Sequence, residues 1–506
     1  METAAPKSET QSPLRKTDFT TDHLFKKMIQ FTISIILISL FQLFFYSMDL
    51  LVVSNFGGGQ TSFAAISSNN ALINLYVSFF VGLSIGANVI VARARGTKNT
   101  LSAHRAIQSS MVIALISSVL VAVIGYFTAR YQLIAMGTPE EILPQATLYL
   151  QLVFCGMPFV IIFNFGAACL RAMGDFKRPL YALIGCGIVN VGLKLLLVLG
   201  LGMKSGGKDV LAVGLATIFS QVVEALLIIL FQLSKKNEFA NLTLSYLKPY
   251  SREYKGILRH GIPAGLQCLA FTLSNVLIQR SVNTYSDGEV TRLIAMNGNA
   301  AALQVEGYIS MIIKAFSVAI VVIAAQNVGA GNKENLKKTL KYCLLTTCSV
   351  SLALGLLAFL LYKPLLSLFL PLSAFTGEGI SADQAQTSWE LALSVGRRRL
   401  LIIGLTYFLY ALMDNTAAFC RGLGHPNTPS IIAFFCVTFY RVVFILTLWN
   451  LVPYFHTLPW LWSIWPISWI LAGLVYVFLV PRYLKEAYLE MDKQALKKPT
   501  AAAVNS

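Results

Sequence analysis

The sequence predicts an all-α integral membrane protein, with twelve transmembrane helices arranged in two pseudo-symmetric six-helix lobes. Three observations support this class. The 506-residue chain is 56% hydrophobic and only 12% charged, whereas roughly a quarter of the residues in a soluble domain are charged. Twelve apolar segments are long enough to cross a bilayer, which takes about 20 residues each. One sequence signature also occurs twice, once in each half of the chain.

The repeated signature lies at residues 164–179 and 414–429. Residues 164–174 read NFGAACLRAMG, residues 414–424 read DNTAAFCRGLG, and a proline follows each at the same offset. The Ala-Ala pair, the arginine and the final glycine coincide. A duplicated set of hydrophobic helices is typical of transporters built from two related halves around a central site.

The apolar segments give the expected spans in chain order. The first begins at Met28 and is too long for the hydrophobic region of a signal peptide, so we expect an uncleaved first helix. Asp49 interrupts this span, and Glu306 and Lys314 lie in the eighth. The expected spans are 28–53, 64–92, 106–128, 144–169, 180–202, 211–233, 259–284, 293–325, 340–362, 396–420, 430–450 and 463–481.

Lysines and arginines cluster on one side of these spans. They occur in the N-terminal tail, in the second, fourth, sixth and eighth loops, and in the C-terminal tail. The positive-inside rule therefore places both termini in the cytoplasm, and we expect a multi-pass protein of the plasma membrane. Three arginines at 397–399, on the opposite side, conflict with the rule. The net charge of +17 is thus interpreted as topogenic, and we expect no nucleic-acid partner.

The same loops define the expected units. These are a cytoplasmic N-terminal tail (1–27), an N-lobe (28–233), a cytoplasmic linker (234–258), a C-lobe (259–481) and a cytoplasmic C-terminal tail (482–506). The linker is charged, as expected of a segment between two units.

Motifs of other protein classes do not occur in the sequence. The eight cysteines lie in or at the ends of apolar segments and form no CxxC pair, so we expect neither disulfides nor a metal site. There is no phosphate-binding loop motif and no cluster of acid–base residues, so we expect neither enzyme activity nor a cofactor. The tryptophans of the last external loop and final span are expected to form an aromatic belt at the membrane interface.

Several short motifs give the chain a family resemblance. They are Met48-Asp49 followed by VSNFGG, GLSIGAN at 82–88, LRAMGD at 170–175, GIPAG at 261–265, AQNVGAGN at 325–332 and RGLG at 421–424. In this order and spacing they resemble the multidrug and toxic compound extrusion (MATE) family over nearly the whole chain. The resemblance implies two six-helix lobes forming a V, and efflux of drug-like compounds driven by inward flow of protons or sodium.

The resemblance assigns an ion-coupling site to the N-lobe. Asp49 matches the acidic residue that binds the driving ion in members with an N-lobe cation site, and Asn190 matches a fifth-helix asparagine. Lys194 stands where the family pattern often has aspartate, and Thr217 matches a position near the same pocket. Positions 190 and 194 share one helix face. Lys194 therefore either pairs with Asp49, favours an anionic or zwitterionic substrate, or extends to a membrane interface.

A second group of polar residues within or at the ends of the spans supplies candidates for the substrate cavity. The charged members could instead close a neutral network with a mainly structural role. The acidic residue that the family's C-lobe site has early in the seventh helix has no counterpart in 267–275, so we expect ion coupling in the N-lobe. The cavity candidates are Asn164, Gln304, Glu306, Lys314, Asp414 and Arg441.

The leading interpretation is a secondary antiporter that exports amphipathic small molecules by alternating access of two lobes, with a proton or sodium as coupling ion. The alternative is a lipid-linked saccharide flippase of the same broader superfamily. The cationic residues Lys194, Lys314 and Arg441 favour the flippase, whereas a count of twelve spans disfavours it. We expect a small-molecule substrate, contact with membrane lipid, and a monomer.

Overall fold

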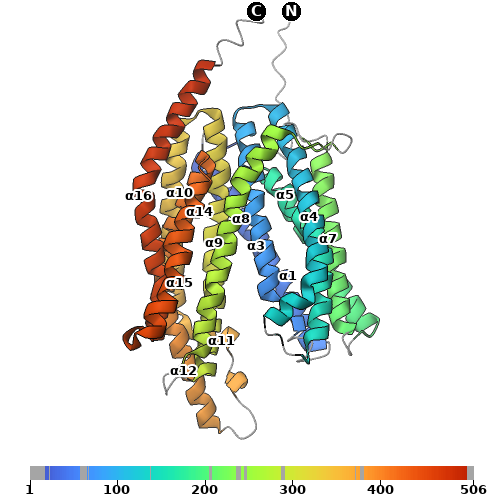
Figure 1. Ribbon diagram of the computed structural model, residues 1–506, viewed down its shortest axis with the longest axis vertical. Coiled ribbons are helices and arrows are strands. Elements are labelled where there is room, and N and C mark those ends of the chain that lie inside the picture. Colours follow the sequence, from blue (N-terminus) through green and yellow to red (C-terminus); the bar gives the residue numbers. More distant parts are fainter. Residues whose placement is uncertain are drawn as a thin grey trace, which may run out of the picture.

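The computed structural model describes residues 18–21, 23–56, 65–66, 68–136, 138, 140–203, 208–234, 241–243, 248–286, 291–370, 372–375 and 381–497. All regular structure within these residues is helical (Figure 1). Twelve helical segments in this part of the chain are long and apolar enough to span a membrane. This confirms the expected fold class.

The N-terminal half of the chain supplies six of these spans. Its helices are α1 (Leu24–Phe56), α3 (Asn70–Gly96), α4 (Thr100–Ala135), α5 (Leu143–Ala172), α6 (Lys177–Leu195) with the π-helical turn η1 (Leu196–Gly200), and α7 (Lys208–Leu233).

The C-terminal half supplies the other six. The seventh to ninth spans are α8 (Ser251–Thr284), α9 (Arg292–Ala330) and α10 (Lys333–Leu360). The short α11 (Tyr362–Phe369) and η3 (Leu372–Phe375) follow. The tenth span joins α12 (Ala382–Ile402), η4 (Gly404–Thr406) and α13 (Tyr407–Leu423). The eleventh joins α14 (Asn427–Ile432), η5 (Ala433–Phe439), α15 (Tyr440–Phe444) and η6 (Ile445–Trp449). After η7 (Pro453–Phe455), the last is α16 (Leu458–Lys497).

Several helices extend beyond the apolar segments that predicted them. α8 begins at Ser251, inside the expected linker, and α16 continues to Lys497, past the expected final span. The tenth span begins at Ala382, earlier than expected, because Ser381 and Gln384 form a capping box that starts α12. Hydropathy finds the part of a helix that crosses lipid, whereas capping residues decide where the helix starts.

The repeated signature forms the same local structure in both halves. Gly174 and Gly424 follow α5 and α13 with left-handed φ angles of 74° and 104°, a conformation that favours glycine at the end of a helix. Pro179 and Pro429 then fall in the first turns of α6 and α14, where a missing N–H costs no helical hydrogen bond. The signature therefore encodes a turn between consecutive helices, once per half.

The two halves meet where α3 crosses α8, and glycines allow the close contact. A Cβ placed on Gly82 would lie 2.6 Å from the Cα of Gly265, and one on Gly86 would lie 2.1 Å from the carbonyl oxygen of Ile257. Only a residue without a Cβ fits at such distances. The motifs at 82–88 and 261–265 therefore pack against each other across the boundary between the halves.

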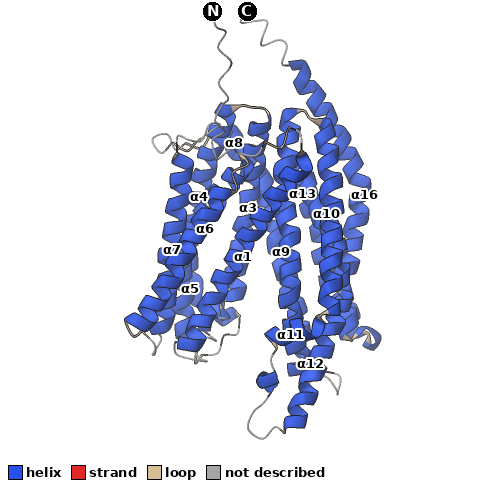
Figure 2. Cartoon of the chain, turned by 180° about the vertical axis from the view of Figure 1, so that it is seen from behind, coloured by secondary structure: helices blue, strands red, loops and turns tan. Residues whose placement is uncertain are grey.

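Hydrogen bonds join the halves at one end of the molecule, called here the closed end. The Arg93 guanidinium donates to the carbonyl oxygen of Leu423 at 2.5 Å, and the Gln326 amide donates to that of Ala172 at 2.7 Å. These bonds connect the ends of α3, α13, α9 and α5. The two groups of helices diverge toward the opposite end, which carries α11 and α12 (Figure 2).

The outer surface of the bundle is apolar, as a membrane requires. On α4, a stripe of exposed side chains recurs every three or four residues, comprising Ile116, Val119, Leu120, Val123 and Phe127. Such a continuous apolar stripe is costly in water but is matched to lipid.

Candidate substrate and ion sites

A cavity of about 330 Å³ lies among the helices of the N-terminal half, called here the N-cavity. Its walls come from α1, α3, α5, α6 and α7, and α9 of the other half borders it. Apolar side chains such as Ile38, Val81 and Phe163 form part of the lining. The polar lining residues are Ser39, Asn164, Arg171, Asn190, Lys194, Thr217, Ser220, Gln221, Glu224 and Lys314. The structure thus brings together Asn164, Asn190, Lys194 and Thr217.

Three buried side chains in this wall form a directed chain of hydrogen bonds. The Lys194 ammonium donates to Asn190 Oδ1, and the Asn190 amide donates to Ser220 Oγ at 2.8 Å. The Ser220 hydroxyl then donates to the carbonyl oxygen of Thr217 at 2.8 Å. Because Lys194 is fully buried, it does not extend to a membrane interface. The i, i+4 spacing on α6 lets its charge engage the amide oxygen of Asn190.

Glu224 is a cavity residue that the sequence assignment of the site left out. It lies on α7, lines the N-cavity and is 6% exposed. Within the described residues, no hydrogen bond or ion pair reaches its carboxylate. Thr217, Gln221 and Glu224 stand at i, i+4 and i+7, so they share one helix face. That spacing is the sequence signal that could have placed Glu224 beside Thr217.

Other polar atoms of this wall also have no partner. The side-chain oxygens of Thr217 and Gln221 and the Nε of Arg171 are buried without a hydrogen bond to any described residue. Buried polar groups in folded proteins are nearly always hydrogen-bonded. A set of unpartnered donors and acceptors around one cavity therefore indicates a site for the polar groups of a ligand.

Asp49 lies within α1, but its side chain falls outside the described residues. The same helix contributes Ile35, Ile38 and Ser39 to the wall of the N-cavity. The assignment of Asp49 to ion coupling, and of Lys194 as its partner, stays a prediction.

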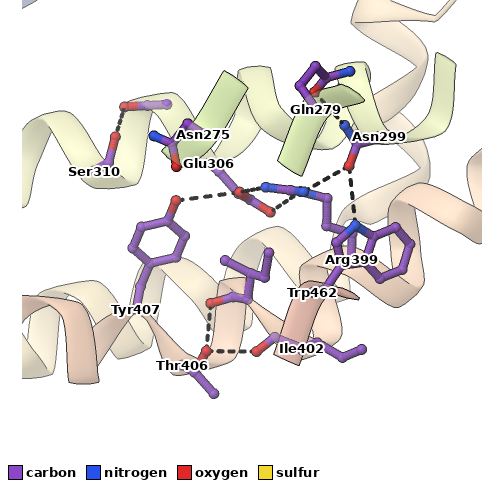
Figure 3. A network of polar contacts seen from close by, with 12 residues as sticks. Asn275, Gln279, Asn299, Glu306, Ser310, Arg399, Ile402, Thr406, Tyr407 and Trp462 are labelled. Carbon is purple, nitrogen blue, oxygen red and sulfur yellow. Dashed lines mark hydrogen bonds and ion pairs between the residues drawn. The ribbon is translucent and has the colours of Figure 1, made fainter. Parts of the chain in front are cut away.

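A second cavity of about 340 Å³, the C-cavity, lies in the C-terminal half. At its wall Glu306 of α9 and Arg399 of α12 form a two-pronged ion pair, with contacts of 2.7 and 2.9 Å (Figure 3). Each side chain is 2% exposed. Asn299 accepts hydrogen bonds from Arg399 at 2.8 Å and from Trp462 at 3.2 Å. Tyr407 donates to Glu306 at 3.4 Å. This network satisfies both buried charges.

Arg399 accounts for one of the three arginines at 397–399 that conflicted with the positive-inside rule; Arg397 and Arg398 are exposed. The Arg399 charge is not in a loop but is neutralised by Glu306 inside the bundle. Arg397 remains exposed and stacks on Tyr362, with its guanidinium 5.0 Å from the ring centre. An internal ion pair carries no information about topology, because it never faces the membrane surface.

Four of the five tryptophans expected in an aromatic belt lie inside the bundle instead. Trp449 and Trp469 are 2% and 4% exposed, and Trp469 also lines the C-cavity. Trp462 is fully buried. Trp465 lines the C-cavity, with the guanidinium groups of Arg399 and Arg441 at 5.0 and 5.3 Å from its ring centre. Indoles attract cations through their ring faces and donate hydrogen bonds when buried. Here the ring face of Trp465 holds two arginines inside the bundle, and the Trp462 N–H donates to Asn299, which also accepts from Arg399.

Lys314 and Arg441 occupy different environments. Lys314 borders both cavities and is exposed. Arg441 is 3% exposed in the C-cavity wall, where it donates to Ser468 at 3.1 Å and to Asn275 at 3.3 Å. The neutral network expected among the candidates is therefore not the one that forms: Glu306 pairs with Arg399, which was not a candidate, and no ion pair in the described residues joins Glu306 to Lys314 or Arg441.

Of the remaining candidates, Asn164 lines the N-cavity, and Asp414 and Gln304 line neither cavity. Asp414 is buried and accepts a hydrogen bond from Ser317, and it lines neither cavity. Gln304 is exposed and also lines neither, because its neighbours take the buried face of α9. Asn164, the counterpart of Asp414 in the repeat, lines the N-cavity and donates to the carbonyl oxygen of Val160 at 2.8 Å.

Twelve spans in two related halves, which meet at one end and each hold a cavity, define a membrane transporter rather than an enzyme. The MatE family model matches residues 34–196 and 263–447. The chain therefore belongs to the MatE family, the multidrug and toxic compound extrusion family that its motifs resemble.

Relatives and solved structures agree with this membership. The chain is 26% identical to the probable multidrug resistance protein YoeA of Bacillus subtilis (strain 168), over 75% of this chain and 77% of that protein. A MOP superfamily transporter from Pyrococcus furiosus has the same fold, with a TM-score of 0.78 and 19% identity over 92% of this chain and 96% of that chain. An outward-facing multidrug resistance MATE family transporter gives a TM-score of 0.77 at 19% identity, with coverage of 92% and 96%.

Proposed function

We propose that this transporter is a proton-coupled antiporter that exports amphipathic, drug-like small molecules across the plasma membrane. The N-cavity carries the proposal, because apolar walls there meet unpartnered polar atoms and one buried carboxylate, Glu224. Its volume, about 330 Å³, lies at the lower end of the range of about 300–1,000 Å³ for small-molecule sites. The similarity to a probable multidrug resistance protein supports the same substrate class.

In this proposal the units expected from the sequence, 28–233 and 259–481, move as two lobes on either side of the linker 234–258. The tails 1–27 and 482–506 and the closed end face the cytoplasm, in accordance with the positive charges near that end. The described conformation is then open to the outside. The repeated half-structure supports a rocking motion of one lobe against the other. Because a single chain contains both lobes, a monomer is sufficient for this motion.

The hydrogen-bond chain at Lys194 favours protons over sodium. A sodium site needs several oxygen ligands, and the Asn190 side-chain oxygen already accepts from the Lys194 ammonium. The Ser220 hydroxyl lies within hydrogen-bonding distance of both the Asn190 amide and the Thr217 carbonyl. A proton needs only a carboxylate that can gain and lose it, the role proposed for Asp49. Glu224 is the proposed counter-ion for a cationic group of the substrate.

The test is transport in proteoliposomes, with proton and sodium gradients imposed separately. A proton gradient alone should drive uptake of a cationic dye into vesicles of the appropriate orientation. One proton crossing 100 mV supplies about 2.3 kcal/mol, enough for a substrate gradient of roughly fortyfold, since tenfold costs about 1.4 kcal/mol. Dependence on sodium alone would overturn proton coupling.

The Asp49→Asn variant tests the coupling residue. An amide is nearly isosteric with the acid but cannot carry a proton, so gradient-driven transport should be abolished while membrane insertion stays normal. Asp383→Asn, an exposed aspartate in the first turn of α12, is the matched control. Full activity of Asp49→Asn would move the search to Glu224.

The flippase alternative makes a different prediction in the same vesicles. Lys194 and Lys314 border the N-cavity and would face an anionic lipid-linked substrate. If several unrelated dyes fail to move, and a fluorescent lipid-linked saccharide crosses the bilayer only when the protein is present, the flippase is the correct function. Dye transport without saccharide movement supports the antiporter.

A further inference from the structure

A third cavity, of about 620 Å³, lies at the closed end and is built by both halves of the chain. The N-terminal half contributes the end of α3 and the start of α4, and the C-terminal half contributes the start of α8. It is separate from the N-cavity and the C-cavity. Arginines from both halves converge on it, and these are Arg93, Arg105, Arg252 and Arg259.

The lining of this cavity is strongly positive. Against its four arginines stands one carboxylate, Glu253, which accepts a hydrogen bond from Ser102 at 3.4 Å. None of the four arginines forms an ion pair with a described residue. The Nε of Arg93 is also buried without a hydrogen bond. Four like charges around one space repel one another unless an anion lies between them.

Two long helices begin at the same cavity. α4 starts at Thr100 and α8 at Ser251, and residues of both first turns line the space. Asn99 caps the start of α4 by accepting a hydrogen bond from the Ser102 N–H, whereas the Tyr250 side chain gives α8 no cap. Helix N-termini present free N–H groups and a partial positive charge, which attract anions and phosphate in particular.

The position of the cavity indicates a lipid rather than a soluble anion. The span of α3 ends at this cavity, and the spans of α4 and α8 begin there. The arginines therefore lie at the level where phospholipid headgroups begin. Leu101, at 57% exposure, and Ile90 also line the cavity, and they offer apolar contact to the adjoining acyl chains. Basic pockets between transmembrane helices at the cytoplasmic surface are suited to anionic headgroups.

We propose that this cavity binds the phosphate-bearing headgroup of an anionic phospholipid, which bridges the two halves and holds the closed end together. Arg93 and Arg105 of the N-terminal half and Arg252 and Arg259 of the C-terminal half bind its phosphate. Opening of the closed end during transport separates these two pairs, so the bound headgroup stabilises the described conformation over the alternative one.

The experiment measures the full-length protein in phosphatidylcholine vesicles with and without phosphatidylglycerol. Phosphatidylglycerol should raise the Tm of the wild type. In Arg252→Gln/Arg259→Gln the apparent affinity should fall roughly thirtyfold, because each arginine near an anionic surface contributes about 1 kcal/mol and about 1.4 kcal/mol is a factor of ten. The charge-preserving variant Arg252→Lys/Arg259→Lys should keep most of the effect.

Lys337→Gln/Lys341→Gln, which removes two exposed charges of α10 at the same end, is the matched control and should respond like the wild type. An equal Tm in pure phosphatidylcholine shows that the arginine variant folds. If it does not fold, the single variant Arg252→Gln replaces it. An unchanged response to phosphatidylglycerol in the arginine variants would overturn the proposal.

A separate arm uses inorganic phosphate with the protein in neutral detergent, against chloride at equal ionic strength. A rise in Tm with phosphate as large as that with phosphatidylglycerol, and lost in the same variants, would show a soluble-anion site and overturn the lipid assignment. A rise confined to the lipid supports it. Because these readouts need no substrate, they stand even if the proposed antiport fails.

Discussion

The N-cavity and the C-cavity are similar in volume, about 330 and 340 Å³, yet their polar groups are used in opposite ways. In the C-cavity, Glu306 and Arg399 neutralise each other, and neighbouring side chains satisfy their remaining hydrogen bonds. In the N-cavity, Glu224 has no partner among the described residues, and the side-chain oxygens of Thr217 and Gln221 are unpartnered.

This contrast indicates a division of labour between related halves. A fully paired buried network has no group left to bind an ion or substrate. Removing either charge leaves the other buried without a counter-ion. An unpaired carboxylate can take up a proton or a cationic group and release it again. Within the described residues, one copy of the duplicated fold therefore pairs its buried charges, whereas the other leaves the Glu224 carboxylate without a partner, as the proposed exchange requires.

The largest expected effect breaks the paired side of the comparison. Glu306→Gln leaves the Arg399 charge buried without a counter-ion, and loss of one partner from a buried pair typically costs about 3–5 kcal/mol of unfolding free energy. Thermal unfolding in detergent should show a large fall in Tm, whereas Glu334→Gln, which removes an exposed pair with Lys338, should show none. A stable but inactive Glu306→Gln protein would instead place transport chemistry in the C-cavity.

The next prediction sharpens the unpaired side. Glu224→Gln removes the proposed counter-ion while keeping the shape of the side chain. A hydrogen bond to a charged group contributes about 1.5–3 kcal/mol, so KM for a monocationic dye should rise about tenfold to a hundredfold, at about 1.4 kcal/mol per factor of ten. KM for an uncharged dye should not change. Glu390→Gln, an exposed glutamate of α12, is the control. Equal changes for both dyes would argue that Glu224 only shapes the wall.

A third prediction tests whether the two halves move as separate bodies. In Gly86→Val the new Cβ would lie 2.1 Å from the carbonyl oxygen of Ile257, which is too close. Overpacking of this kind typically costs about 1–3 kcal/mol of stability. The closed end should open more often, so maleimide labelling of buried Cys169 should increase about tenfold when each cysteine is followed by mass spectrometry. Cys343, buried within the C-terminal half, should stay protected.

Gly192→Val is the matched control for that variant, because nothing lies within 4 Å of a Cβ at Gly192. If Gly192→Val exposes Cys169 to the same degree, or if Cys343 is labelled as strongly as Cys169, the halves do not move as separate bodies.

The smallest effect concerns Asp18, a half-exposed acid at the closed end. Burial raises the pKa of Asp18, but hydrogen bonds from Thr20 and the charges of Arg95 and Lys27 outweigh it and hold the pKa below its ordinary value. Asp18 therefore stabilises the fold above its ordinary pKa of 3.8, and this stability is lost as the pH falls through its lowered value. The contribution should be under about 1 kcal/mol, because solvent screens such pairs.

Tm measured against pH for the wild type and Asp18→Asn checks this prediction. The wild type should be slightly more stable at neutral pH, and the two curves should converge in acid. A constant difference across the range would show that the side chain acts through packing and not through its charge. Asp18 thus has partners, as Glu306 does and Glu224 does not, but because it is half-exposed its charge contributes less to stability than that of Glu306.

The sequence by itself determined the helices and their duplication. Hydropathy is a local property, so all twelve spans could be read without knowledge of their neighbours, and so could the Arg-x-x-Gly turns at Gly174 and Gly424. Motif order also identified the family. The i, i+4 spacing placed Asn190 and Lys194 on one helix face, because helix geometry is known in advance, but the hydrogen bond between them came only from the structure.

Only the tertiary structure decided which charges meet. Glu306 and Arg399 are 93 positions apart, and nothing local distinguishes Arg399 from Lys314 or Arg441 as a partner. Likewise, hydropathy could not show that Trp465 stacks on arginines inside the bundle, or that arginines from α3, α4 and α8 converge on one space. Pairing depends on how helices pack across the bundle, and that packing is set by contacts distant in sequence, such as the close approach of Gly86 to Ile257.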